Sequence, residues 1–257
     1  MYHFNRALVR PPSRSVVDGL SATARDKPAF EGVAREHAAY VQALEAAGLT
    51  VETLPPLEAY PDSVFVEDTA LVFSGAAIVL RPGAPTRRGE ITEIAPTLER
   101  LFPRVMHLSE GFVDGGDVLA TPRGIFIGES ARTDAQGARA LTALLAEIGL
   151  EGIAVATPHD VLHLKSDCAL LDAETILVTA RLAATGIFKA FRLIVVPPDE
   201  EAAANAVRIN DHVLLSESHP RTGEQLARAG YTTVPLPTRE IAKIDAGLSC
   251  MSLRWRG

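Results

Sequence analysis

The two cysteines of this 257-residue chain stand in different surroundings. Cys250 lies between two serines in the segment KIDAGLSCMSLR, shortly after the turn-forming residues Asp245 and Gly247. Polar neighbours and a nearby turn favour an accessible and reactive thiol at this position. Cys168 lies in the more apolar segment DCALLD, so we expect it to be a small core residue.

Acidic residues and a histidine stand at intervals along the chain before Cys250. The segments FVED, VDGGD and LHLK supply Glu67, Asp68, Asp114, Asp117 and His163. Buried carboxylates resist ionisation unless a cation neutralises them. If these segments meet in the fold, the cluster predicts a cationic guest, either a metal ion or an organic cation.

The spacing of these residues is unusual for a metal site. Cysteine, histidine and aspartate are zinc ligands, but no pair here resembles the short chelating motifs CxxC or HExxH. We therefore expect no metal and no other cofactor.

A planar guanidinium is a better match for the acidic residues, because carboxylates accept its N–H groups two at a time. Its central carbon is electrophilic, so the thiolate of Cys250 can attack it while His163 protonates the departing amine. Acids around the thiol should raise the pKa of Cys250, and a bound cation should reverse that effect.

A repeated pattern of strand, strand, helix and strand can bring these residues together. The anchors of the pattern are spaced about 42 to 49 residues apart, a period typical of repeat architectures: Glu67, Asp114, His163, Asn205 and Cys250. Each anchor is expected at the start of the first strand of its unit. One unit is expected to be split, with parts supplied by the two chain ends.

Apolar periodicity predicts the helices of these units over residues 31–47, 91–102 and 134–148 and in the segment GEQLARAG. Thr133 with Gln136, and Thr222 with Gln225, form T-x-x-Q capping boxes. Pro96 should kink its helix or delay its start. Glycines are expected to end three helices: Gly48, Gly149 and Gly230.

Units of this kind cannot bury a core alone, but packed radially they form a closed ring around a central channel. The sequence therefore predicts an α/β protein, a five-bladed α/β propeller of ββαβ units. An ordinary three-layer α/β sandwich is the alternative. The length fits one large domain or two small ones. Because no Gly/Ser linker divides the chain, we expect one domain over residues 1–257.

Composition and charge exclude several classes of partner. A hydrophobic content of 47% is enough to bury a sizeable core. The net charge of −7 and the lack of a basic stripe argue against nucleic acid as a partner. No segment is long enough to span a membrane, and the N-terminus lacks the apolar centre of a secretory signal. Two cysteines without a CxxC motif suggest a reducing cytoplasm.

Six motifs occur in order along nearly the whole chain: PDSVFVEDTALV, RRGE, GGDVL, IGESART, LHLK and KIDAGLSCMSLR. Together they resemble the dimethylargininase (dimethylarginine dimethylaminohydrolase) family. That family belongs to the guanidino-group-modifying superfamily, with arginine deiminases and amidinotransferases. The resemblance implies a five-bladed α/β propeller, the pentein fold. It also implies hydrolysis of Nω-methylated arginines to citrulline and dimethylamine or methylamine.

The resemblance implies roles at the reacting end of the substrate. Cys250 would form a covalent thiouronium intermediate. His163 would protonate the leaving amine and then activate the hydrolytic water. Asp68 and Asp114 would hold the guanidinium nitrogens, and Glu67 would orient His163.

The resemblance also implies contacts at the amino-acid end. Arg87 in TRRGE and Arg132 in GESART would bind the α-carboxylate. Asp62 would lie near this end of the substrate. The backbone carbonyls of Leu20 and Ile244 would accept hydrogen bonds from the α-ammonium group.

Several alternatives stay open. Arginine deiminase activity is one, although deiminases are usually longer and carry an inserted helical region. Amidino transfer and non-catalytic binding of guanidines or arginine are the others, and retention of both Cys250 and His163 argues against mere binding. Some bacterial members of the family carry glutamate where this chain has Asp114, so the preferred N-substituent is open. The family also suggests a homodimer.

Overall fold

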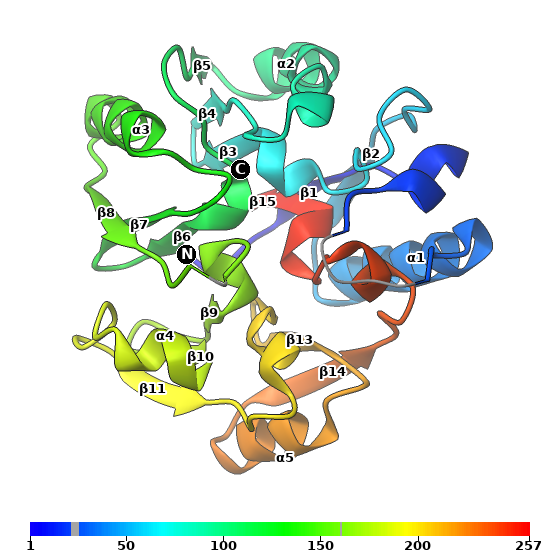
Figure 1. Cartoon of the computed structure of the whole chain (residues 1–257), viewed down its shortest axis with the longest axis vertical. Helices are drawn as coiled ribbons and strands as arrows, with labels where there is room; N and C mark the ends of the chain where they lie inside the picture. Colours follow the sequence, from blue (N-terminus) through cyan, green and yellow to red (C-terminus); the bar gives the residue numbers. More distant parts are fainter. Residues whose placement is uncertain (22–25, 160) are drawn as a thin grey trace.

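The strands of the computed structural model, which describes residues 1–21, 26–159 and 161–257, form five three-stranded sheets arranged in a ring (Figure 1). In every sheet one strand pairs antiparallel with the middle strand, and the other pairs parallel with it. The antiparallel strands lie toward the centre of the ring. This arrangement confirms the predicted five-bladed α/β propeller and excludes a three-layer sandwich.

Four blades are continuous in sequence. Their strands are β3 (Ala70–Phe73), β4 (Ala76–Val79) and β5 (Arg104–His107); β6 (Val118–Thr121), β7 (Gly124–Glu129) and β8 (Gly152–Ala156); β9 (Cys168–Leu170), β10 (Thr175–Val178) and β11 (Arg192–Val195); and β12 (Val207–Ile209), β13 (His212–Ser216) and β14 (Thr232–Leu236).

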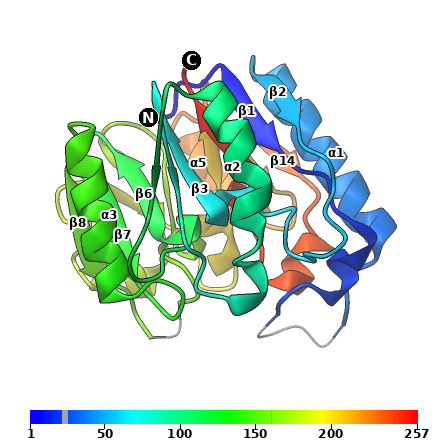
Figure 2. The ribbon, with the colours of Figure 1, turned by 90° about the horizontal axis from the view of Figure 1, so that it is seen from above.

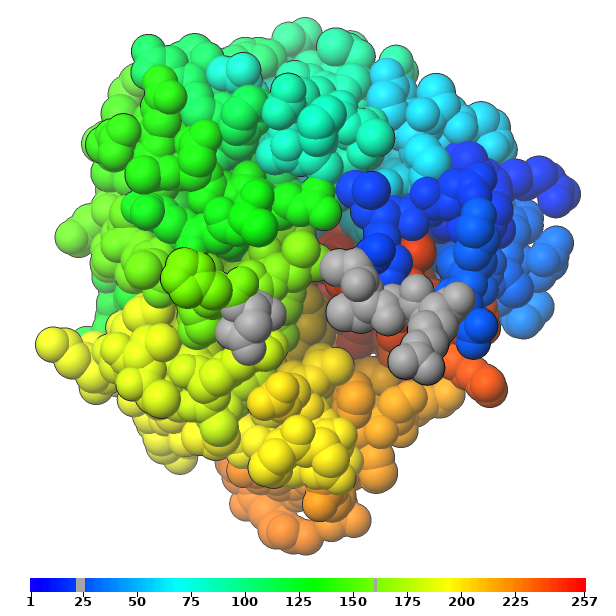
Figure 3. Space-filling model, viewed as in Figure 1, coloured from blue at the N-terminus to red at the C-terminus, as the bar shows by residue number. Residues whose placement is uncertain are grey.

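The remaining blade joins the two ends of the chain, as predicted. It pairs β15 (Ser252–Trp255) with β1 (Arg6–Val9), and β1 with β2 (Thr50–Thr53). The first and last parts of the chain therefore lie side by side near the centre of the face in Figure 3. Because the last strand begins two residues after Cys250, this closure of the ring also fixes the position of the thiol.

A helix joins the middle strand to the outer strand of each blade and covers the outside of the ring (Figure 2). The helices are α1 (Phe30–Ala46), α2 (Glu90–Leu101), α3 (Ala135–Glu147), α4 (Ala180–Ala184) and α5 (Pro220–Arg228). Helix α3 shows the packing, since Leu141 and Leu145 lie one turn apart and both are fully buried against strands such as β7. Three helix-ending glycines have the predicted positive φ: Gly48 (95°), Gly149 (74°) and Gly230 (91°).

The predicted capping boxes are wrong. Asp134 caps α3, and its carboxylate accepts a hydrogen bond from the Gly137 amide at 2.6 Å. Thr133 is buried one position earlier, and its hydroxyl donates to Asp117 at 2.7 Å. Thr222 lies inside α5, where its hydroxyl donates to the buried carboxylate of Glu200 at 2.6 Å.

Pro96 lies inside α2, which begins six residues earlier at Glu90. The proline therefore does not delay the start of the helix. No helix of the described ranges is long and apolar enough to cross a membrane.

A short 3₁₀ turn precedes the inner strand of every blade. The five turns are η2 (Val66–Thr69), η4 (Gly115–Asp117), η5 (Leu164–Ser166), η6 (Glu201–Ala204) and η8 (Ser249–Met251). The predicted anchors therefore lie in or beside these turns, not in the strands. Gly115 allows two turns to touch, because a Cβ atom there would lie 1.9 Å from the backbone oxygen of Glu67.

Candidate active site

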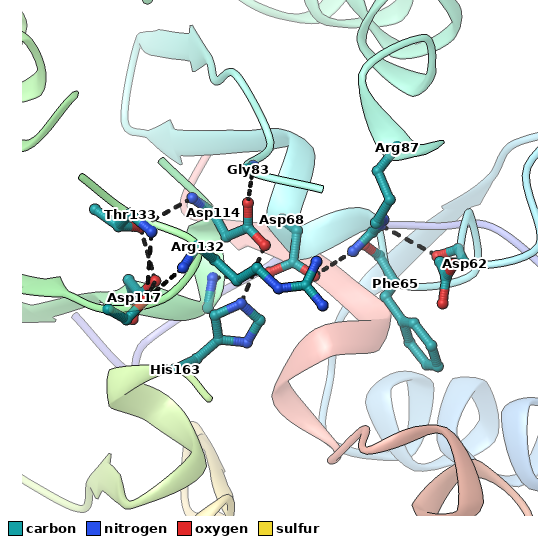
Figure 4. Close-up of polar contacts among 12 residues, drawn as sticks. Asp62, Phe65, Asp68, Gly83, Arg87, Asp114, Asp117, Arg132, Thr133 and His163 are labelled. Carbon is teal, nitrogen blue, oxygen red and sulfur yellow. Dashed lines mark hydrogen bonds and ion pairs between the residues drawn. The ribbon is translucent and has the colours of Figure 1, made fainter. Parts of the chain in front are cut away.

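Four of the inner turns bring the predicted reactive residues to one place, and Figure 4 shows Asp68, Asp114 and His163 from three of them. Asp68, Asp114 and His163 each present a ligand atom within 4.8 Å of the others, and Cys250 lies in η8, which packs against η2. The amide of Gly116 donates to Asp68 at 2.9 Å. A Cβ atom at Gly116 would lie 2.8 Å from the His163 ring, so only glycine permits this close packing.

His163 is held by a carboxylate that is itself fixed. The Nε2 atom of His163 lies 3.0 Å from Asp114 Oδ2, and Asp114 Oδ1 accepts a hydrogen bond from the Gly83 amide at 2.7 Å. Burial lowers the pKa of His163, but the hydrogen bond to Asp114 and the charges of Asp68 and Asp117 outweigh it and raise the pKa to about 9. The imidazole is therefore protonated at neutral pH and can act as an acid.

The two thiols differ in burial, as predicted. Burial, reinforced by the charges of Asp68 and Glu67, raises the pKa of Cys250 to about 12. Cys250 is half-buried, whereas Cys168 is 1% exposed and its Sγ atom donates to the backbone oxygen of Leu164. Burial also raises the pKa of Cys168. Its position inside the core confirms the prediction that it is a core residue.

Asp68 has a buried counter-ion. Arg87 is 4% exposed; its guanidinium pairs with Asp68 and donates to both carboxylate oxygens of Glu90 at 2.8 and 2.9 Å. It also donates to the backbone oxygens of Asp62 and Phe65. Burial raises the pKa of Asp68, but the charges of Arg87 and His163 and the hydrogen bond from the Gly116 amide together outweigh it, so the pKa of Asp68 is lowered. Asp68 is therefore already ionised before a cationic ligand binds.

The residues predicted for the amino-acid end lie together. Asp62 accepts a hydrogen bond from the Leu20 amide at 2.9 Å. A Cβ atom at Gly19 would lie 3.2 Å from both Asp62 and Ile244, so these segments are in contact. In Figure 4 the side chain of Arg132 extends across the site. Burial raises the pKa of Asp62, and the charges of Arg87 and Arg132 oppose this rise.

The prediction that Glu67 orients His163 is wrong. The carboxylate in contact with the imidazole is Asp114, whereas Glu67 is directed to three other side chains: Ser249 (2.9 Å), Lys165 (2.6 Å) and Arg254 (3.0 Å). Glu67 and Asp68 are adjacent in η2, so the turn sends their side chains in different directions. The internal contacts of Arg87 likewise make it a partner of Asp68 before any substrate is bound.

Sequence reasoning gave Asn205 no function. Its side-chain oxygen accepts a hydrogen bond from the Ser249 amide at 3.1 Å, next to the thiol. Gly247 allows this approach, because a Cβ atom there would lie 2.3 Å from the Asn205 side chain. In the sequence, only the position of Asn205 among the regularly spaced anchors indicated that it lies near the site.

The donor set of Asp68, Asp114 and His163 can hold a cation in two ways. Two carboxylates and one imidazole are a set that zinc accepts. The same carboxylates can accept the N–H groups of a guanidinium, whose central carbon the neighbouring thiol can attack.

Comparisons with known proteins agree over nearly the whole chain. Residues 21–179 match the family model described as "N,N dimethylarginine dimethylhydrolase, eukaryotic". The N(G),N(G)-dimethylarginine dimethylaminohydrolase of Pseudomonas aeruginosa is 41% identical over 254 residues, which cover 98% of this chain and 100% of that protein. This chain belongs to the dimethylarginine dimethylaminohydrolase family. The Streptomyces coelicolor enzyme of the same name is 34% identical, over 98% of this chain and 97% of that protein.

Solved structures of the dimethylarginine dimethylaminohydrolase family share this fold. A cysteine-to-serine mutant of the P. aeruginosa enzyme in complex with citrulline matches with a TM-score of 0.95 and 40% identity, covering 98% of this chain and 100% of that one. The N-terminal domain of a cyanobacterial arginine dihydrolase matches with a TM-score of 0.85 at 21% identity, covering 97% of this chain and 96% of that one, which shows a common fold alone. The chain is accordingly a hydrolase that acts on amidine C–N bonds.

Proposed function

We propose that this chain hydrolyses Nω-methylated arginines to citrulline and dimethylamine or methylamine through a covalent intermediate on Cys250. The observation that carries the proposal is the convergence of this thiol with two carboxylates and an imidazole whose pKa is about 9. The citrulline complex of a relative with 40% identity supports the same product.

The first half of the reaction forms the carbon–sulfur bond. Asp68 and Asp114 accept N–H groups of the guanidinium, whose positive charge lowers the pKa of the Cys250 thiol. The thiol loses its proton to solvent, and the thiolate attacks the central carbon. His163 then gives its proton to the methylated nitrogen, the C–N bond breaks, and the amine leaves a thiouronium on the sulfur.

The second half of the reaction removes the substrate from the enzyme. His163 is now neutral and takes a proton from a water molecule, which attacks the thiouronium carbon. The hydroxyl proton of the resulting adduct passes to solvent as the carbon–sulfur bond breaks, the electron pair returns to Cys250 as thiolate, and citrulline is released. Water is the only other reactant, and neither an oxidant nor a reductant is needed.

The amino-acid end of the substrate sets the position of the reacting carbon. Arg132 is proposed to bind the α-carboxylate, whereas Arg87 pairs with Asp68. Arg132 is the better placed of the two, because the guanidinium of Arg87 is already engaged with buried acceptors. The carbonyls of Leu20 and Ile244 are proposed to accept from the α-ammonium, with Asp62 beside them.

We further propose one hydrolase domain over residues 1–257, a homodimer, and a cytoplasmic location. The blade shared by the two chain ends supports the single domain, because removing either end would open the sheet β15–β1–β2. Light scattering coupled to size exclusion tests the dimer, and a mass equal to one chain would contradict it.

The test of the reaction is product analysis with three substrates. Purified protein is incubated separately with asymmetric dimethylarginine, monomethylarginine and arginine, and citrulline, ornithine and the released amine are quantified. We expect citrulline with an equal amount of methylamine or dimethylamine, and far less product from arginine. Preference for arginine would indicate deiminase activity, ornithine would indicate amidino transfer, and no product would leave a binding protein.

A further inference from the structure

A second set of polar side chains lies behind the reactive ones, in the central channel. Three of them are close sequence neighbours of Asp68, His163 and Cys250. They line a cavity of about 540 Å³ that, among the described residues, is not lined by those three reactive side chains. The set, called the rear cluster below, consists of Glu67, Lys165, Ser249 and Arg254.

Glu67 is the centre of the rear cluster. Its Oε2 atom accepts a hydrogen bond from the Ser249 hydroxyl at 2.9 Å. Its Oε1 atom lies 2.6 Å from Lys165 Nζ and 3.0 Å from Arg254 Nη2. The three charged side chains are only 5%, 12% and 12% exposed. One buried carboxylate therefore connects the turns η2, η5 and η8 and the strand β15.

Arg254 holds both ends of the turn that carries the thiol. Its Nη1 atom donates to the backbone oxygens of Ser249 at 3.0 Å and Ser252 at 2.9 Å, which lie on either side of Cys250. It also donates to the Ser252 hydroxyl at 2.7 Å. The two N–H groups of Nη1 are shared among these three acceptors, while Nη2 faces Glu67, so one planar guanidinium connects the turn to the carboxylate.

We propose that Glu67 and Arg254 are positioning residues that fix the Cys250 turn relative to the turns of Asp68 and His163. This inference rests on the proposed hydrolysis. Buried ion pairs contribute little net stability compared with apolar side chains of similar size, so their presence here fits a geometric role. A shift of about 1 Å between reacting groups costs roughly 100-fold in rate, which is the kind of error the cluster prevents.

The rear cluster also acts on the thiol by charge. Burial and the charge of Asp68 raise the pKa of Cys250 most, and Glu67 adds to the rise, whereas Lys165 opposes it. Removing Glu67 or Lys165 should therefore shift the reactivity of the thiol in opposite directions. A role in folding alone would not produce opposite shifts.

The test uses Glu67→Gln, Arg254→Lys and Lys165→Met in the full chain. Each variant is measured for kcat and KM on asymmetric dimethylarginine, melting temperature, and the pH dependence of iodoacetamide alkylation at Cys250, located by peptide mass. Glu200→Gln is the matched control. It removes the charge of a buried carboxylate that also accepts side-chain and backbone hydrogen bonds, outside the reactive site.

We expect kcat to fall roughly 10- to 100-fold in Glu67→Gln and about tenfold in Arg254→Lys, with KM within about threefold, because the substrate lies on the other side of the turns. The midpoint of alkylation should move to lower pH in Glu67→Gln and to higher pH in Lys165→Met. Glu200→Gln should leave kcat and the alkylation midpoint unchanged.

Two results would overturn the inference. The first is folded Glu67→Gln and Arg254→Lys variants with wild-type kcat. The second is shifts of the alkylation midpoint in the same direction for Glu67→Gln and Lys165→Met, or no shift in either. The alkylation measurement needs no hydrolysis, so it still decides the role of the rear cluster if the wild type fails to convert dimethylarginine. Arg254→Lys keeps the charge and most of the size, so it guards against a variant that does not fold.

Discussion

The inner turns and the outer helices of the propeller contain different chemistry. Turns such as η2 and η4 bury Asp68 and Asp117 among counter-ions and amide groups, whereas α3 buries the apolar side chains Leu141 and Leu145. Buried carboxylates have shifted pKa values and depend on the exact positions of their partners. Apolar helix faces depend only on side chains of suitable shape and volume. Substitutions in the turns should therefore change catalysis, and substitutions in the helices should change stability.

The largest effect that sharpens this comparison is expected from His163→Asn. Loss of the acid and base should lower kcat about 1,000-fold, because general acid–base catalysis typically contributes 100- to 10,000-fold. Citrulline release measures the rate, and thermal unfolding should show little change. His107→Asn, at an exposed position of β5, is the control and should keep wild-type kcat. Substantial turnover by His163→Asn would contradict the proposed role of His163 as proton donor.

Asp114→Asn should have the next largest effect and should also alter the pH profile. The acid is needed in its protonated form, so wild-type activity should be lost as pH rises through about 9. Without the Asp114 charge the pKa of His163 falls, so this loss should occur at lower pH, with kcat at pH 7 reduced about 10- to 100-fold. A profile of kcat against pH measures it. An unmoved basic limb would show that Asp114 does not set the pKa of His163.

Arg132→Lys should weaken substrate binding more than chemistry. A lysine cannot make the two-pronged contact of a guanidinium with a carboxylate, so KM should rise about tenfold while kcat changes less than threefold. Arg104→Lys changes an exposed ion pair on the outside of the ring and serves as the control. If KM is unchanged, the α-carboxylate is bound elsewhere, and Arg87 becomes the next residue to test.

His37→Leu, in the outer helix α1, is expected to change stability alone. His37 is 4% exposed, its Nε2 atom has no hydrogen-bond partner among the described residues, and burial lowers its pKa to about 4. The unfolded chain therefore binds a proton that the folded chain does not between about pH 6.5 and pH 4, so wild-type stability falls as pH drops through this range.

Between pH 7 and pH 4.5 the free energy of unfolding should fall by roughly 2 kcal/mol less in His37→Leu than in the wild type. The kcat at pH 8 should be unchanged. Urea unfolding at the two pH values measures the difference. Equal losses in both proteins, or a reduced kcat, would contradict the separation between helices and turns.

The sequence predicted the ring because its anchors recur at a nearly constant interval, and it predicted the helix ends at Gly48, Gly149 and Gly230. It did not show the 3₁₀ turns, since three or four residues are too few for a periodic pattern. The prediction of capping boxes was wrong because Thr133 and Thr222 bind partners distant in sequence, Asp117 and Glu200. No local motif reveals such partners.

The reactive residues were predictable by type, but their pairing was not. Glu67 and Asp68 are adjacent acids, and only the turn decides which one faces the site and which one faces Arg254. Lys165 stands two residues after His163, so its role in the rear cluster likewise depends on the direction that η5 gives its side chain.

The most direct test of the central claim is the intact mass of the protein after mixing with excess asymmetric dimethylarginine and quenching in acid. Wild type and Cys250→Ser are compared, with citrulline assayed in parallel. A transient added mass on the wild type alone, with citrulline accumulating, is the predicted result and identifies Cys250 as the nucleophile. Citrulline formation by Cys250→Ser at the wild-type rate, or a wild type that neither gains mass nor releases citrulline, would contradict the account.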